Sequence, residues 1–174
     1  LGGSLLLSAA SNLLSQPVTP DAARPENIRA ISKSAAAPRV RHYGVVRVGG
    51  NVVFHRGRDG HSYRLVVHGH GEIDSVIQVY LNEEPVTLDG NGFVTEAQYV
   101  VGGIARVQIE HRLGLVPSAH YPRLDSNFVG WTPQHRLDGL CTSMIVLNSV
   151  PPEDHQAVYP KGEPDISILA LTSK

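Results

Sequence analysis

Short segments in which hydrophobic and polar residues alternate fill most of the sequence after residue 40. The segments "RVRHYGVVRV" (39–48), "NVVFH" (51–55) and "SYRLVVH" (62–68) are rich in Val and Tyr, and the last two flank the turn "RGRDG". Runs of β-branched residues around an Asp-Gly turn are typical of a β-hairpin. This part of the chain therefore predicts strands joined by tight turns.

The same alternation continues downstream. The segment "SVIQVYLN" (75–82) places Ile77, Val79 and Leu81 on one face of a strand, and the next residues, "EEPVTLDGNGFV", supply a Gly-rich turn and a further hairpin. Later strands are predicted at "IARVQIEH" (104–111), "CTSMIVLN" (141–148) and "DISILAL" (165–171). The predicted fold is mainly β, an antiparallel, hairpin-rich sandwich or barrel-like domain.

The longest stretch without strand patterns covers residues 114–140 and is rich in Pro, His and Arg. A connection of this length is uncommon inside a compact domain unless it has structure or a function of its own. We expect a long irregular excursion with one helical turn.

The first 16 residues, "LGGSLLLSAASNLLSQ", carry no charge. Leu6, Leu7, Leu13 and Leu14 fall on one stripe at helical spacing, with Ser4 as a candidate N-cap. This predicts an amphipathic docking helix whose leucines contact a partner. The alternative is a membrane or leader segment, although a spanning helix needs about 20 apolar residues and a leader needs a preceding basic segment.

Residues 17–38 are rich in Pro, Ala, Arg and Ser, which favours an extended connector. The chain is therefore divided into an N-terminal apolar helix and connector (1–38) and a β-rich domain (39–174). Because the sequence opens without Met and closes on "DISILALTSK", which reads as an interrupted strand, we expect a piece of a longer polypeptide.

Charge and cysteine content narrow the function classes. Fifteen Lys and Arg residues against 16 Asp and Glu residues give a net charge of −1. The chain therefore lacks the broad positive field that holds nucleic acid or an anionic membrane. A single cysteine, Cys141, excludes an internal disulfide, and its apolar neighbours predict a buried, unreactive thiol.

One stretch raises the question of a metal site. In "HGHGEID", His68, His70 and Glu72 stand at every second position, so an extended chain would present them on one face as ligands for zinc or a similar metal. Gly69 and Gly71 instead favour a turn. We predict a polar turn with solvated His and Glu side chains, and keep a metal-dependent hydrolase using these three residues as a weaker alternative.

No catalytic motif is present in the sequence. The histidines do not show H-E-x-x-H spacing, and no serine stands in a G-x-S-x-G segment. The chain is therefore not expected to be an enzyme or to need a cofactor. Trp131 is either an exposed aromatic for sugar stacking or partner contact, or a core anchor beneath the excursion. With Tyr121, the first reading gives a second hypothesis, a β module that binds surface polysaccharide.

Longer segments resemble a known family. "YGVVRVGGNVVFH" (43–55), "SYRLVVHGHGEIDSVIQVYLNEEPVTLDGNGFV" (62–94), "HRLDGLCTSMIVLN" (135–148) and "YPKGEPDISILALTSK" (159–174) resemble, in order and spacing, the central tail hub of long-tailed bacteriophages. These tail tip attachment or host-specificity protein J-like proteins have relatives in gene transfer agents. The resemblance covers about two thirds of the chain, and residues 113–136 have no matching pattern.

The resemblance implies a structural protein of the virion, located at the distal end of the tail. Such hubs form homotrimers that close the tail tube. They bind the distal tail protein and other tail tip or baseplate proteins, with the tape measure protein as a further candidate partner. A host receptor is then contacted only indirectly, and no sequence-specific nucleic acid, metal or cofactor is involved. In this family the "GEID" segment is a turn leading into a strand.

Overall fold

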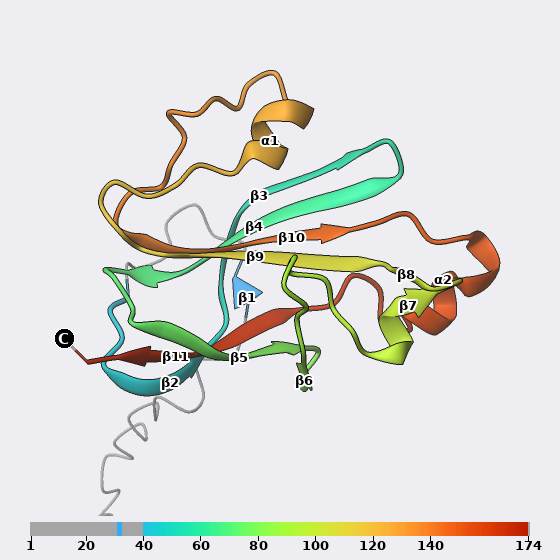
Figure 1. Cartoon of the computed structure of the whole chain (residues 1–174), viewed down its shortest axis with the longest axis horizontal. Coiled ribbons are helices and arrows are strands. Elements are labelled where there is room, and N and C mark those ends of the chain that lie inside the picture. The colour runs from blue at the N-terminus through green and yellow to red at the C-terminus, as the bar shows by residue number, and fades with distance from the viewer. Residues whose placement is uncertain (1–30, 33–39, 174) are drawn as a thin grey trace, which may run out of the picture.

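The computed structural model describes residues 31–32 and 40–173. The predicted helix with Leu6, Leu7, Leu13 and Leu14, and most of the predicted connector, lie outside these residues. The described chain is mainly β, as predicted, and its strands form two stacked sheets (Figure 1).

The larger sheet has five strands. Their order is β1 (Ile31–Ser32), β3 (Gly50–Arg58), β4 (His61–His70), β10 (Leu140–Leu147) and β9 (Val107–Leu113). The smaller sheet has four strands, in the order β2 (Gly44–Val48), β11 (Ile166–Thr172), β5 (Ser75–Leu81) and β6 (Glu84–Val86). All neighbouring pairs in the two sheets are antiparallel except β1 and β3, which are parallel.

Smaller elements lie between the strands. They are the 3₁₀ turn η2 (Ala97–Tyr99), the hairpin of β7 (Val100–Val101) and β8 (Ile104–Ala105), and the helices α1 (Pro122–Asn127) and α2 (Pro152–Val158). No helix in the described part of the chain is long and apolar enough to cross a membrane.

Side chains from the facing sides of the two sheets form the interior. The main cluster joins Val66, Ile109 and Ile145 of the five-stranded sheet to Val79 and Ile166 of the four-stranded sheet. A second cluster contains Val48, Ile73, Cys141, Ile168 and Ala170. Alternation along the strands, interrupted at β-bulges, supplies these inward positions, as expected for a sandwich. Cys141 is buried as predicted, and burial raises the pKa of its thiol to about 12.

The five-stranded sheet is covered on both faces. Its outer face carries a third cluster, in which Tyr63, Met144 and Val146 pack against Tyr121 and Leu124 of the segment after β9. Figure 1 shows this segment and α1 as a third layer above the sheet. Because β10 lies between two packed layers, nearly all of its residues are buried, which explains the uninterrupted apolar run in its sequence.

The hairpin around the "RGRDG" turn is confirmed as β3 and β4. In β5, the prediction that Ile77, Val79 and Leu81 share one face is wrong for Ile77. Opposite β5, Gln78 pairs with Leu169 and Val76 pairs with Ala170, so Ile77 is the extra residue of a β-bulge. The bulge turns Ile77 outward, 50% exposed, while Val79 and Leu81 stay buried as predicted.

The predicted excursion is confirmed over residues 114–139, with α1 as its helical turn. It begins at Gly114, where φ is +87° and a Cβ would lie 2.5 Å from the Gly71 carbonyl oxygen, so only glycine fits. Helix α2 was not predicted. Its signals, a proline in the first turn followed by Glu153 and Asp154, are those that favour a helix start.

Candidate functional site

A row of polar side chains crosses the interior between the apolar clusters. His68 comes from β4, Ser143 from β10 and His111 from β9, three neighbouring strands of the five-stranded sheet. Ser143 lies directly opposite His111, whereas His68 is the extra residue of a β-bulge between positions paired with Cys141 and Thr142. From this position the His68 ring points at Ser143.

The hydrogen bonds of this row determine where each proton sits. His68 Nδ1 lies at hydrogen-bond distance from the Gly49 carbonyl, which only accepts, so this nitrogen carries the proton. Neutral His68 then accepts at Nε2 from the Ser143 hydroxyl, at 2.7 Å. The Ser143 oxygen in turn accepts from His111 Nδ1, also at 2.7 Å. His111 therefore has an unprotonated Nε2 at the end of the row.

Burial keeps the row neutral. Loss of water contact lowers the pKa of His68 to about 4, with the nearby His42 adding to the shift against an opposing backbone hydrogen bond. The same desolvation, together with His68 and Arg112, lowers the pKa of His111 to about 3. Charging either ring would place an ion between the two sheets, which is costly.

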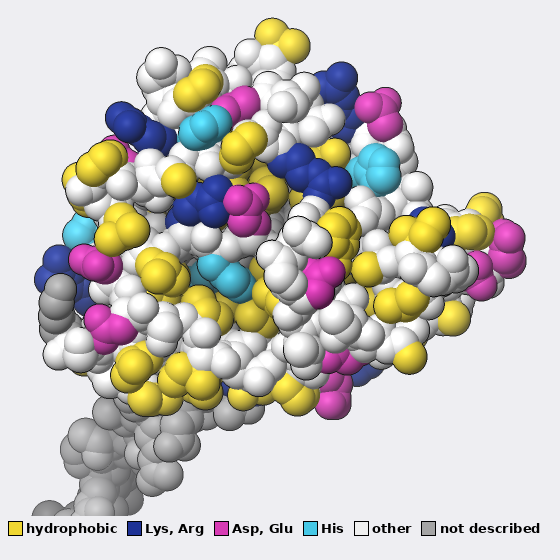
Figure 2. Space-filling model, viewed as in Figure 1, with side chains coloured by type: hydrophobic (Ala, Val, Ile, Leu, Met, Phe, Trp, Pro, Cys, Tyr) yellow, Lys and Arg dark blue, Asp and Glu magenta, His cyan; other side chains and the backbone are white. Residues whose placement is uncertain are grey.

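The row ends at a pocket of about 270 Å³. His111 forms one wall, and the other lining residues come from β5, β6 and the segment after β6: Val76, Ile77, Gln78, Val79, Val86, Thr87 and Leu88. His111 Nε2 is buried, and no described residue gives it a hydrogen bond. Figure 2 shows a hollow in the middle of one face of the molecule, with a histidine inside and hydrophobic side chains around it.

The chemistry available to this site is recognition. Ser143 has the two imidazole contacts that a nucleophile and its base would have, yet it is fully buried and does not line the pocket. A nucleophile must reach its substrate. The pocket instead offers an uncharged surface in which Val, Ile and Leu side chains outnumber polar ones, which suits an apolar group from a ligand or a partner.

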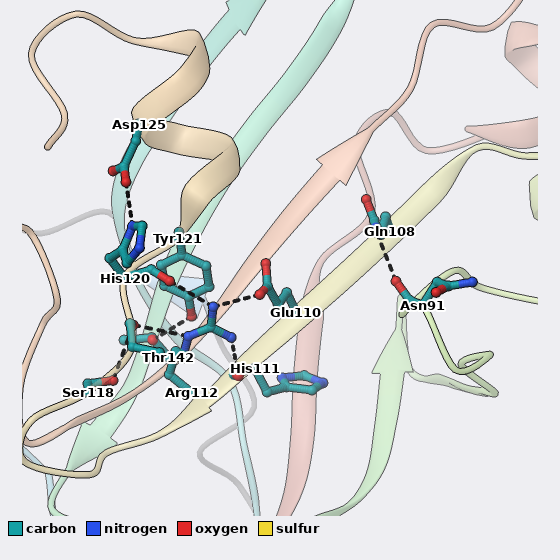
Figure 3. Close-up of polar contacts among 11 residues, drawn as sticks. Asn91, Gln108, Glu110, His111, Arg112, Ser118, His120, Tyr121, Asp125 and Thr142 are labelled. Carbon is teal, nitrogen blue, oxygen red and sulfur yellow. Dashed lines mark hydrogen bonds and ion pairs between the residues drawn. The ribbon is translucent and has the colours of Figure 1, made fainter. Parts of the chain in front are cut away.

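A second polar cluster lies on the opposite face of the same strands (Figure 3). Arg112 contacts Glu110 at 2.6 Å and donates to the carbonyl oxygens of Ala119 and His120 at 3.1 and 2.8 Å. Its guanidinium also lies over the Tyr121 ring, 4.4 Å from the centroid. Arg112 therefore fastens the excursion to β9.

The excursion is held by further polar contacts. Tyr121 and Thr142 share a buried hydrogen bond of 2.7 Å, and burial raises the pKa of the Tyr121 hydroxyl well above its usual value. His120 pairs with Asp125, and the Ser118 N–H donates to Asp138 at 2.7 Å. These contacts organise a segment in which only α1 is regular.

The structure places Trp131 in the core-anchor position. Its half-buried ring packs edge-on against Phe54, with centroids 5.2 Å apart, and joins the outer cluster with Phe128. Its Nε1 atom is buried. This geometry favours packing over an open platform for sugars, while a contact of its remaining exposed edge with a partner stays a prediction.

The predicted solvated turn is wrong for His68, which is buried inside β4. The strand continues through Gly69 because its missing side chain makes room for the His42 ring, 2.7 Å from where a Cβ would stand. His70 ends the strand, and Glu72 is exposed in the turn that follows. No group of three metal-ligating side chains is found among residues 31–32 and 40–173.

The sequence reasoning missed Ser143 and His111. Their signal was a hydroxyl inside an apolar strand and an imidazole at an inward position of its neighbour. That signal becomes readable only when the pairing of β9 with β10 is known.

Comparisons with known proteins identify the fold. No protein-family model and no curated protein matches the chain. Among solved structures, it is similar to a chain of the "virion of native gene transfer agent (GTA) particle", at 15% identity and a TM-score of 0.55. The match covers 84% of this chain and 29% of that one, so this chain corresponds to less than a third of its neighbour's length. At this identity the likeness shows a shared fold.

Proposed function

We propose that this chain is a structural domain of a phage-like virion, a tail hub component that closes the distal end of the tail tube as a homotrimer. Its role is mechanical, and the buried histidines and serine serve packing and recognition, with no catalytic step. Its partners are further copies of itself, the distal tail protein and other tail tip or baseplate proteins.

The observation that carries the proposal is the fold shared with a gene transfer agent virion chain over 84% of this chain. It agrees with the resemblance of residues 43–55, 62–94, 135–148 and 159–174 to tail hubs, which rests on sequence pattern alone. Backbone shape and motif order therefore both support a structural protein of a phage-like virion.

The surface supports an assembly role. The outer face of the four-stranded sheet carries Val45, 61% exposed, and the half-buried Leu169 and Leu171. Beside them Arg47 lies 3.8 Å from the centre of the Tyr80 ring. Figure 2 shows hydrophobic side chains gathered along the lower part of the view. No described segment covers this face as the excursion covers the other sheet, and neighbouring subunits would supply the missing layer.

Light scattering on the purified chain, with an intact-mass spectrum to fix the protomer mass, tests this proposal. We expect a species of three times 18.8 kDa. Val45→Asp should weaken the assembly at least tenfold, whereas Ile104→Asp on β8, at the similarly exposed position of 58%, should leave it intact. A monomer at every concentration would overturn the trimer.

A further inference from the structure

The pocket at the end of the histidine row is selective by charge. None of its lining residues carries a formal charge at neutral pH, since the lowered pKa keeps His111 neutral. An ion placed there would lose its water without gaining a partner of opposite charge. His111 also presents no N–H to the pocket, because its Nδ1 is bonded to Ser143 and its Nε2 is buried, so a carboxylate or carbonyl oxygen would find no donor there. The fitting occupant is an uncharged, apolar side chain.

The pocket also lies at an open edge. In β9, Ile109 N–H donates to Gly92 and Leu113 C=O accepts from Ile73, so both positions of this edge are covered by loops. His111 lies between Ile109 and Leu113 in β9. Because hydrogen bonding alternates along an antiparallel strand, its backbone N–H and C=O also point away from β10. On the opposite side of the pocket, the bulged Ile77 projects outward from β5. A segment arriving from outside meets both walls at once.

One segment of this chain matches that chemistry. Residues 1–20 contain no charged side chain, and the leucines at 5–7, 13 and 14 are interleaved with Ser and Asn. In the described part of the chain, the uncharged run around β10 is already buried. We propose that the pocket binds leucine side chains from residues 5–14 of a second copy of this chain. This inference rests on the proposed assembly and names its contact.

Connectivity favours a second copy over the same one. The N-terminal segment joins the sandwich at β1, at the far edge of the five-stranded sheet from β9. An arm that leaves one edge of a subunit and binds the opposite edge of the next makes a head-to-tail contact, and three such contacts close a ring. The 14 residues between positions 16 and 31 can extend about 50 Å, enough to reach a neighbour.

Disulfide trapping in the full chain tests the contact. Chains with Leu13→Cys or Leu7→Cys are assembled together with chains carrying Ile77→Cys and then oxidised. We expect a covalent dimer on a denaturing gel. The control is Val53→Cys, because Val53 is also the extra residue of a bulge, in β3, and is 49% exposed but does not line the pocket. The natural Cys141 is buried and does not compete.

The outcomes separate the two proposals. If the wild type assembles but neither leucine position crosslinks to Ile77→Cys above the Val53→Cys level, the pocket inference is wrong and the assembly stands. If a chain carrying both Leu13→Cys and Ile77→Cys forms the disulfide within itself, the contact is made by the same copy and the proposed contact with a second copy is wrong. A wild-type monomer overturns the assembly and this inference together. Ile77→Asp should lower the crosslink yield of a Leu13→Cys and Leu88→Cys pair at least fivefold, and Val53→Asp should not.

Discussion

Ser143 and Thr142 are neighbours in β10, yet they belong to polar clusters of opposite character. Ser143 joins His68 and His111 in a neutral row between the sheets. Thr142 points to the outer face and bonds to Tyr121, next to the charged pair of Arg112 and Glu110. A step of one residue along β10 moves the side chain from the outer to the inner face of the sheet, and so from a charged to a neutral environment.

The difference follows from the access of water to each cluster. The outer cluster keeps a charged pair because Glu110 reaches solvent and Arg112 is stabilised by carbonyl oxygens. The inner row reaches the surface through the pocket beside His111 and has no charged partner among the described residues that line it, so each of its groups is neutral and donates to the next. The inner cluster is stable because each neutral group donates a hydrogen bond to the next group in the row. The outer cluster is stable because its charges are paired and hydrated.

The largest expected effect is on the free energy of unfolding at low pH, to which the inner row should be more sensitive than the outer cluster. His68 and His111 hold protons less tightly in the folded chain than in the unfolded chain, whose histidine pKa is about 6.5. Their stabilising contribution is therefore complete above pH 6.5 and is lost as pH falls toward 4. The free energy of unfolding should fall by up to about 1.4 kcal/mol per pH unit for each histidine.

Urea unfolding between pH 4.5 and 7.5 measures this slope. His111→Asn retains a side-chain N–H for Ser143 but does not titrate, so it should remove about half of the slope. His135→Asn, at an exposed position, should leave it unchanged. A wild-type slope that is absent in this range would show that the row is hydrated.

The next effect concerns the hydroxyl that joins the two rings. Ser143→Ala leaves His68 Nε2 and His111 Nδ1 buried without a partner, and should cost about 1–3 kcal/mol of unfolding free energy. Ser149→Ala, at an exposed serine just after the same strand, should stay within about 0.5 kcal/mol. Equal midpoints for the two variants in urea would argue against a continuous row.

The smallest effect belongs to the outer cluster. Tyr121→Phe leaves the Thr142 hydroxyl unpaired and should cost about 1 kcal/mol, whereas adding Thr142→Val removes both polar atoms and should recover most of the loss. A double-mutant cycle by urea unfolding checks this. If the double variant is as unstable as the sum of the singles, the hydroxyl pair is not an isolated contact of the outer face.

The sequence predicted the strands well because the physical cause is local. Alternation in residues 62–68 and 104–111, and the apolar run of 141–148, require only that one or both faces of a strand be buried. The excursion was predicted for a similar reason, since residues 114–139 lack such a pattern. Element type is therefore encoded over a few neighbouring residues.

The candidate site could not be predicted because it depends on bulges and register. His68 and Ile77 are both extra residues of β-bulges, and the bulge at Ile77 turns its side chain to a face that simple alternation does not give. The glycines beside His68 read as a turn, although one of them serves the packing of His42. The places of His68, Ile77 and His42 all depend on pairing between distant strands, which a single sequence does not display.

The closed base of the excursion has an evolutionary consequence. Gly139 donates to Leu115 and accepts from Gly71, and Gly114 packs on the Gly71 carbonyl, so the two ends of a 26-residue segment, 114–139, meet at one point of the sandwich. Lengthening a loop whose ends are already joined costs only about 0.6 kcal/mol per doubling. Insertions at its tip would leave the strand register untouched, so the tip can change between lineages while Tyr121 and Leu124 keep the excursion packed on the sheet.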